Sequence, residues 1–213
     1  MANSAVASRP TRRDATREAI LAAGLYCFGR DGFRRTALDR VAQEAGVSRA
    51  AVYLHFANKE ELFRALVDDL HARALAEATT AARGGGPLAE RLTAAMVAKT
   101  ARFFDLLRAS EHADEFLDEN HRLCGEISAT FATKHAKLLG RMIAAAAAAG
   151  ELALATRGAS ATQVADLLLD VAEGIKTRHR AILSSDAYRQ RLGDAVRIVL
   201  AGFAPVTPAK RRR

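Results

Sequence analysis

The sequence predicts an all-α fold, because its composition, its periodicity and its lack of strand patterns agree. Half of the 213 residues are hydrophobic, tryptophan is absent and aromatic residues make up only 6%. Alanine and leucine are abundant, and both lose little conformational entropy in a helix. Apolar residues recur at the spacing of a helix face, and neither an alternating strand pattern nor an internal repeat is found. The length fits one medium domain, or a small domain joined to a larger one.

The N-terminal segment begins with a polar, basic stretch and continues into a helix. Residues 1–13 are expected to form a loose arm. A helix is predicted over Asp14–Arg30, because apolar residues fall at positions i, i+4 and i+7. Gly32 follows it, where glycine readily adopts the left-handed conformation that ends a helix.

Two short helices separated by a tight turn come next. Thr36 and Asp39 are spaced as a weak capping box for the first, which Gly46 ends after little more than two turns. Ser48 is placed to cap the second. Two short helices joined in this way form the layout of the helix-turn-helix, in which the second helix enters the major groove of DNA. Many helical cores contain such a pair, so the layout alone leaves DNA binding open.

The remainder of the chain predicts longer helices with short breaks. Asn58 and Glu61 are spaced as a capping box for a helix that runs to a hinge at Gly84–Pro87. Further helices are expected over 88–108, 111–119, 126–149, 162–183 and 187–203, the second of them short and acidic.

The net charge of +8 is concentrated towards the two ends of the chain. Residues 1–56 carry nine Arg and Lys against five Asp and Glu, and the four residues from Lys210 to Arg213 are all basic. Residues 57–209 are neutral overall, with nineteen charges of each sign. A basic N-terminal region on a neutral body favours an anionic partner such as nucleic acid. The C-terminal tail is interpreted as a solvated end.

Features of several other protein classes are missing. The two cysteines, Cys27 and Cys124, form no CxxC pair, which argues against a disulfide framework and a zinc finger. No signal-peptide pattern is found, and the longest apolar run, Ile143–Ala149, is too short to span a bilayer, so a cytoplasmic protein is expected. No phosphate loop, zinc-ligand motif or nucleophile elbow is found. A protein without enzymatic activity or cofactor is favoured, while an unfamiliar active site and a protein-interaction module stay open.

The segment from Ile20 to Leu66 resembles the DNA-binding domain of the TetR family of bacterial regulators. The positions that carry the resemblance are Ile20 through Phe28, Gly32, Phe33, Thr36, Val41, Ala42, Ala45 through Ser48, Tyr53, His55, Phe56, Lys59, Glu60 and Leu62. The rest of the chain is similar to the family only in length and helical plan. The resemblance implies a helix-turn-helix DNA-binding domain at 14–57 and a larger helical ligand-binding and dimerisation domain at 58–204, with a basic tail at 205–213.

The resemblance also implies roles in DNA binding for individual residues. Arg49 takes a base-reading position, where its guanidinium can bind guanine O6 and N7. Ala50 and Ala51 allow close approach and can contact a thymine methyl group. Positions expected to contact phosphates are Thr36, Tyr53, His55 and Lys59, with Arg34 and Arg35 as additional contacts. Structural roles stay open for three of them: Thr36 could only cap a helix, Tyr53 only pack, and His55 lie at the core edge.

The last two predicted helices are too apolar for the surface of a monomer, which favours a homodimer. Their apolar positions are Val164, Leu167, Leu168, Val171 and Ile175 in the first, and Leu192, Val196, Val199 and Phe203 in the second. In the family that the sequence resembles, these helices form a four-helix bundle with the partner subunit, although packing within one chain takes part of the surface. A two-fold dimer places two reading helices roughly 34–36 Å apart on a palindromic operator of double-stranded DNA.

A pocket for a small-molecule effector is expected among the helices between residues 60 and 180. Candidate lining residues are Met96, Thr100, Phe103, Phe104, Leu107, Phe116, Leu117, His121, Phe131, His135 and Met142. Apolar walls with few polar groups are typical of ligand pockets, but also of ordinary cores. The sequence as a whole therefore predicts a ligand-responsive transcriptional regulator, by family default a repressor that a small molecule releases from its operator.

Three other groups in this region are less specific. The acidic stretch Glu111–Glu119 is interpreted as a solvated helix face, with attraction of a cationic ligand as the alternative. His112, His121 and His135 show no metal-ligand spacing. Cys124 is interpreted as a small apolar residue, with a sensor of oxidants as the alternative.

Overall fold

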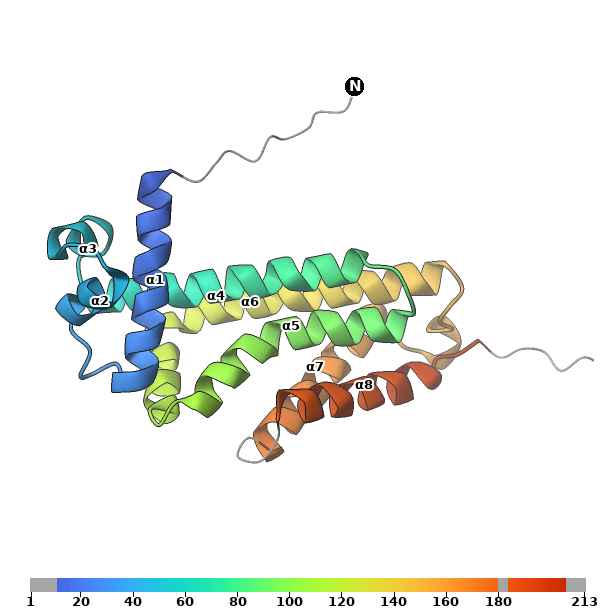
Figure 1. The fold of residues 1–213 in the computed structure, drawn as a ribbon. Helices are drawn as coiled ribbons and strands as arrows, with labels where there is room; N and C mark the ends of the chain where they lie inside the picture. The colour runs from blue at the N-terminus through green and yellow to red at the C-terminus, as the bar shows by residue number, and fades with distance from the viewer. Residues whose placement is uncertain (1–10, 180–183, 206–213) are drawn as a thin grey trace, which may run out of the picture. The chain divides into compact units, whose positions relative to one another are not determined.

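The computed structural model describes residues 11–179 and 184–205, without the side chains of residues 100–109 and 179. The described residues form eight α-helices and one 3-10 turn and contain no strand, which confirms the predicted all-α fold (Figure 1). The helices are α1 (Arg12–Asp31), α2 (Leu38–Ala45), α3 (Arg49–His55), α4 (Lys59–Arg83), α5 (Leu88–Ala109), α6 (Ala113–Ala148), α7 (Ala161–His179) and α8 (Ser185–Ala201), with the 3-10 turn η1 at Ala155–Arg157. Most of the predicted arm and tail lies outside the described residues.

Contacts along the chain divide it into two compact units. The N-terminal unit comprises Met1–Asp69 and Ala109–Gly125, and the C-terminal unit comprises Leu70–Arg108 and Glu126–Arg213. The expected boundary after residue 57 therefore does not coincide with this division. The N-terminal unit takes in the first turns of α4 and of α6 as well as α1, α2 and α3.

An aromatic cluster explains why these turns belong to the N-terminal unit. Phe28 of α1 lies 5.4 Å from both Phe33 and Phe63, and Phe33 and Phe63 lie 5.2 Å apart, all as ring-centroid distances. Phe116 of α6 completes the cluster at 4.9 Å from Phe63. All four rings are buried, and burial of aromatic surface is a large stabilising contribution. Phe63 and Phe116 thus tie α4 and α6 into the core of this unit.

Local capping signals set the ends of the first helices. Thr11 and Asp14 form a reciprocal capping box, so α1 begins two residues earlier than predicted. Gly46 ends α2 in the left-handed conformation with φ 65°, and the Ser48 hydroxyl accepts from the amide of Ala51 at the start of α3, as the sequence predicts.

Thr36 does not cap α2, contrary to the prediction. The residue that precedes α2 is Ala37, which offers no side-chain hydrogen bond. The hydroxyl of Thr36 is turned towards the end of α1 and lies 2.7 Å from the carbonyl oxygen of Gly32 and 3.3 Å from that of Cys27. Thr36 is buried, so it locks the α1–α2 connection rather than the start of α2.

The acidic stretch is the beginning of a long helix and not a separate short one. α6 is continuous over 36 residues and joins the two helices predicted at 111–119 and 126–149. The intervening sequence contains no proline and a single glycine, Gly125, so nothing in it forces the helix to end.

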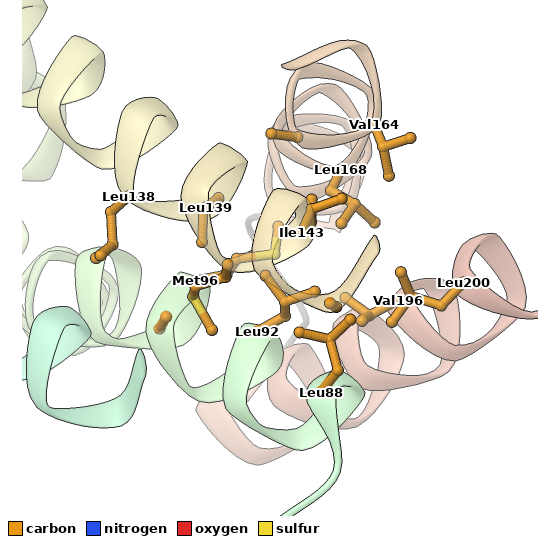
Figure 2. Close-up of a cluster of buried hydrophobic side chains, with 14 of the residues drawn as sticks. Leu88, Leu92, Met96, Leu138, Leu139, Ile143, Val164, Leu168, Val196 and Leu200 are labelled. Atoms are coloured by element: carbon orange, nitrogen blue, oxygen red, sulfur yellow. The ribbon is translucent and has the colours of Figure 1, made fainter. Parts of the chain in front are cut away.

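The core of the C-terminal unit is apolar and is built by α5, α6, α7 and α8. Figure 2 shows its centre, in which side chains from these four helices meet. Ten of them are labelled there: Leu88, Leu92, Met96, Leu138, Leu139, Ile143, Val164, Leu168, Val196 and Leu200. Among the helices that the structure describes, none offers an apolar stretch of the length needed to cross a bilayer.

Candidate nucleic-acid interface and ligand cavity

α3 exposes one face and is fixed in the N-terminal unit by the other. Val52 and Phe56 are buried and anchor the helix and its C-terminal end. Ala50 is exposed on the opposite side, together with Tyr53 and Leu54, whose exposed fractions are 55% and 79%. Large hydrophobic side chains at such exposure are available to a partner molecule. Their position on the second helix of the motif is where a DNA-reading face is expected.

Arg49 lies at the start of this exposed face and is paired within the chain. Its guanidinium forms an ion pair with the carboxylate of Asp39 on α2, while its side chain remains 69% exposed. The pair is solvent-exposed, so it contributes little to stability. Its effect is to hold the guanidinium beside Asp39 of α2.

Lys59, the first residue of α4, binds backbone carbonyl groups. Its Nζ donates to the carbonyl oxygens of Phe33 and Arg34 at 3.1 and 3.0 Å, and lies 4.7 Å from the centre of the Phe33 ring. The side chain is half-buried. Two of its three ammonium donors therefore hold the α1–α2 connection, which leaves one for an outside acceptor.

The start of α6 contacts the same connection. Glu115 Oε1 accepts a hydrogen bond of 2.7 Å from the amide of Arg34, and His112 Nε2 accepts one of 2.6 Å from Arg35 Nη2. Gly32 has φ 81°, and a Cβ added there would lie 2.5 Å from Glu115 Oε2. The backbone at Gly32 therefore leaves space that the carboxylate fills. The acidic stretch thus has a structural role here that neither of its two expected interpretations included.

The other residues expected to contact DNA differ in exposure. Arg34 is 79% exposed and His55 is half-exposed, with its ring 6.1 Å from that of Phe56. Arg35 is exposed, although its Nε donates to the carbonyl oxygen of Asp31. Ala51 is half-buried beneath the exposed face. Thr36, as described above, is buried and its hydroxyl is occupied, so the structure contradicts its assignment as a phosphate contact.

A small cavity in the C-terminal unit is lined by three helices. Its walls are His71, Ala74 and Leu75 of α4, Lys99 of α5, and Phe131 and His135 of α6. Sequence reasoning anticipated Phe131 and His135 and missed the rest. The residues are far apart in the chain, and no local pattern links a histidine on α4 to a lysine on α5.

The polar groups of this cavity differ in their hydrogen bonding. His135 is 2% exposed; its Nε2 lies 3.0 Å from the carbonyl oxygen of Ala95, and its Nδ1 has no hydrogen-bond partner in the described residues. Burial, and then the charge of Lys99, lowers the pKa of His135 to about 4. Burial, and then the charge of Lys176, lowers the pKa of Lys99. His71 lies 3.2 Å from the Ser128 hydroxyl, measured from its Nε2.

Several expected pocket residues lie elsewhere. Met96 and Met142 belong to the apolar core because neighbouring helices bury them. Phe116 packs on Phe63 in the N-terminal unit, to which Leu117 and His121 also belong, and His121 is exposed. The side chains that lie outside the described residues are those of Thr100, Phe103, Phe104 and Leu107.

The expected dimer residues fall into two groups. Four are buried in the core of their own chain and cannot form the centre of an interface: Val164, Leu168, Leu192 and Val196. Val171, Ile175, Val199 and Phe203 are half-buried. Leu167 on α7 is 46% exposed, and Ile198 on α8, which was not among the candidates, is 73% exposed.

The cysteines and histidines supply no other reactive centre in the described residues. Cys27 and Cys124 are both buried, and burial raises the pKa of Cys124 to about 11 and that of Cys27 above its ordinary value. A raised pKa disfavours the reactive thiolate. In the part of the chain that the structure describes, no three His, Cys, Asp or Glu side chains are grouped so as to hold a metal ion.

The sequence is similar to known proteins, chiefly at the helix-turn-helix. Residues 20–66 match the family model of the bacterial regulatory proteins of the tetR family. The HTH-type transcriptional regulator TtgR of Pseudomonas putida is 46% identical over 65 residues, 30% of this chain and 31% of TtgR. A probable acrEF/envCD operon repressor of Escherichia coli is 32% identical over 111 residues, 49% of this chain and 50% of that protein. The matched region thus spans 31% and 50% of these two curated relatives.

The likeness to solved structures extends over nearly the whole chain. SmeT, the repressor of the Stenotrophomonas maltophilia multidrug efflux pump SmeDEF, has a TM-score of 0.63 at 23% identity and covers 94% of this chain and 98% of SmeT. A complex of SmeT with triclosan has a TM-score of 0.65 at 24% identity, over 93% of this chain and 98% of that one. At this identity the likeness shows a shared fold. Residues 20–66 thus match the model of the tetR family, and the chain shares the fold of SmeT over nearly its whole length.

Proposed function

We propose that this protein is a transcriptional repressor that binds a palindromic operator as a homodimer and leaves it when a small molecule binds. The observation that carries the proposal is the exposed face of α3, which presents the side chains of Arg49, Tyr53 and Leu54. Aromatic, apolar and guanidinium groups on the second helix of a helix-turn-helix are suited to base edges and phosphates in the major groove. The match of residues 20–66 to the tetR family model supports the same function.

The contacts with DNA divide into two kinds. Arg49 reads a base, and Ala50 and Ala51 permit close approach. Phosphate contacts come from Arg34, Arg35, Tyr53 and His55, and from the one donor of Lys59 that the chain does not use. Phosphate contacts give affinity and orientation, whereas the base contact gives sequence preference. A regulator of this kind acts in the bacterial cytoplasm, where chromosomal DNA is found.

The dimer is supported by the exposed apolar side chains of the last two helices. Ile198 and Leu167 are exposed, and the small residues Gly174 and Ala201 are exposed on the same two helices. Exposed apolar groups of this kind mark an interaction surface, and a two-fold interface uses the same patch on both subunits. We expect this surface to bring two copies of α3 to successive major grooves of one operator.

The effector site is supported by the cavity between α4, α5 and α6 and by the relatives. SmeT, whose fold this chain shares, is a repressor of a multidrug efflux pump and has been solved with triclosan. A ligand that prefers the conformation unable to bind the operator shifts the population away from DNA.

A DNA-binding assay at several salt concentrations tests this function. Fragments of the source genome that the purified protein retains would identify the operator. Binding to that operator should weaken steeply as salt rises, because neutralised phosphates release counterions. Binding that is independent of salt, or no preference for any fragment, would instead favour a helix-turn-helix that docks a protein partner. Light scattering should give twice the 22.8 kDa chain mass, and a monomer at micromolar concentration would contradict the dimer.

A further inference from the structure

The cavity of the C-terminal unit contains a hydrogen-bond acceptor that the chain does not use. His135 Nε2 lies 3.0 Å from the carbonyl oxygen of Ala95. A carbonyl oxygen only accepts, so Nε2 carries the proton, and in a neutral imidazole Nδ1 is then a bare acceptor. The lowered pKa of His135 keeps the ring neutral at pH 7. Nδ1 is buried without a partner in the described residues, which is a costly arrangement unless another group completes it.

Lys99 brings an unused donor to the same cavity. Its ammonium group can only donate, and it forms no hydrogen bond or ion pair with another described residue. The other charges near it are Lys176, which disfavours the cation, and Glu173, whose carboxylate lies 2.6 Å from the Lys176 ammonium. The cavity therefore combines one free acceptor with one free cationic donor.

We propose that this cavity binds the hydroxyl group of a phenolic compound. The hydroxyl donates its proton to His135 Nδ1, and its oxygen accepts a hydrogen bond from Lys99 Nζ. The proposal rests on the function proposed above in naming the compound an effector, but the binding itself requires no DNA.

The other walls of the cavity suit an aromatic body. Ala74 and Leu75 are apolar, and Phe131 stacks on His71 with ring centroids 5.2 Å apart. The cavity offers about 10 Å³ to the centre of a water molecule, which is room for about one oxygen atom. A phenyl ring is larger, so binding selects a conformation in which these walls have moved apart. That difference between free and bound forms is what a regulatory ligand requires.

Other head groups match the cavity less well. A carboxylate has no proton at neutral pH, so its lone pairs would face the lone pair of His135 Nδ1. An aryl ether accepts from Lys99 but donates nothing to His135. An aliphatic alcohol can do both, but it is a weaker acid than a phenol and therefore a weaker donor, and Lys99 favours an oxygen with partial negative charge.

Calorimetry with three matched probes tests the proposal on the full-length protein without DNA. The probes are 4-chlorophenol, 4-chloroanisole and 4-chlorobenzoate at pH 7.5. We expect 4-chlorophenol to bind about tenfold more tightly than 4-chloroanisole, which is the ordinary contribution of a hydrogen bond in a desolvated site. Equal affinities, tighter binding of 4-chlorobenzoate, or no binding of 4-chlorophenol would each overturn the proposal.

Two variants identify the groups that bind the hydroxyl. His135→Gln retains an amide donor for Ala95 and moves the acceptor away from the position of Nδ1, because its carbonyl oxygen lies elsewhere. Lys99→Met removes the ammonium at nearly constant length. Each should remove most of the preference for phenol over anisole. The matched controls are His121→Gln and Lys137→Met, which change exposed residues of α6 and should keep the preference. If either cavity variant keeps it too, that residue does not bind the hydroxyl and the proposed geometry is wrong.

Two readouts separate this proposal from the proposed function. In wild-type protein, the imidazole ¹⁵N resonance of His135 Nδ1 should move upfield as 4-chlorophenol saturates, because the bare nitrogen gains a hydrogen bond. An unmoved resonance would contradict the proposal even if DNA binding is found. Failure of DNA binding with an intact phenol preference would refute the repressor and leave the hydroxyl site standing.

Discussion

The two units of the molecule use their polar groups in opposite ways. In the N-terminal unit Lys59 donates to two carbonyl groups, Arg49 is paired with Asp39, and Glu115 accepts from the amide of Arg34. In the C-terminal unit His135 and Lys99 share a cavity and each leaves a group unused among the described residues. Paired groups fix the shape of a surface before a partner arrives. Unpaired groups leave a cavity whose stability depends on what enters it.

Lowering the pH should destabilise the C-terminal unit through His135. Its pKa is about 4 in the folded protein against an ordinary value of 6.5, so the unfolded chain takes up a proton first as pH falls. The free energy of unfolding should therefore decline between pH 6.5 and 4. Lys99 and His71 are the other titratable residues that line the cavity of His135. The decline specific to His135 is roughly 3 kcal/mol.

Urea unfolding of wild type and His135→Gln across this pH range measures the effect. The variant lacks the titrating ring and should lose stability less steeply. Parallel curves for the two proteins would mean that the imidazole titrates normally and is not held neutral by burial.

Gly32→Ala tests whether the N-terminal unit is as tightly fixed as its contacts indicate. The added Cβ meets Glu115 Oε2 at 2.5 Å and sits at φ 81°. The carboxylate can yield only by giving up its hydrogen bond to Arg34, so we expect a loss of about 2–3 kcal/mol. Denaturant unfolding measures the loss.

Gly46→Ala is the matched control, because Gly46 also has positive φ but nothing lies within 4 Å of an added Cβ. It should show the backbone strain alone, about 1–2 kcal/mol. The cost of Gly32→Ala should also fall in a Glu115→Ala background, since the two positions are in contact. Equal costs at both glycines would show that Glu115 does not occupy the space beside Gly32.

Arg49→Ala tests the base contact. We expect operator binding to lose about 1–3 kcal/mol per half-site and preference to relax at one base position, with little change on random DNA. Titrations against operator and scrambled duplex measure both effects. The control is Arg191→Ala, a change at an exposed arginine of α8. An equal loss on both duplexes would make Arg49 a phosphate contact.

Lys59→Met should have the smallest effect of these variants. It should lower both the stability of the protein and its affinity for DNA. The variant loses two hydrogen bonds to carbonyl groups and a cation–π contact, worth about 1–2 kcal/mol in a half-exposed setting. Lys134→Met is the control, because Lys134 also lies 4.7 Å from an aromatic ring, that of Phe131. Thermal unfolding separates the two. If both variants are equally stable, the carbonyl contacts of Lys59 add nothing and its role is confined to DNA.

The sequence predicted features that depend on neighbouring residues. The stop at Gly46, the cap at Ser48 and the exposed face of α3 each follow from spacing within a few positions. Thr36 shows the limit of such reasoning. Its spacing is compatible with a cap at the start of α2 and with hydrogen bonds to the end of α1, and local spacing does not decide between them.

Features that join distant segments could not be predicted in the same way. Apolar periodicity on α7 and α8 is the same for residues buried within one chain, such as Leu168, and for exposed ones, such as Leu167. The contact of Glu115 with Gly32 joins positions that are 83 residues apart in the sequence. The glycine at position 32 was the one sequence feature that indicated a constraint there. The cavity brings together residues of three helices, so the sequence around Lys99 alone does not indicate that Lys99 lines it.

The ion pair between Arg49 and Asp39 has a consequence for how the protein finds its site. Under the function proposed above, the Asp39 carboxylate would compete weakly with each phosphate that the guanidinium meets along the duplex. A guanine offers two aligned acceptors, and only there does an exchange of partners become favourable. Under the proposed function, Asp39 would therefore favour release of Arg49 at a guanine over release at a single phosphate.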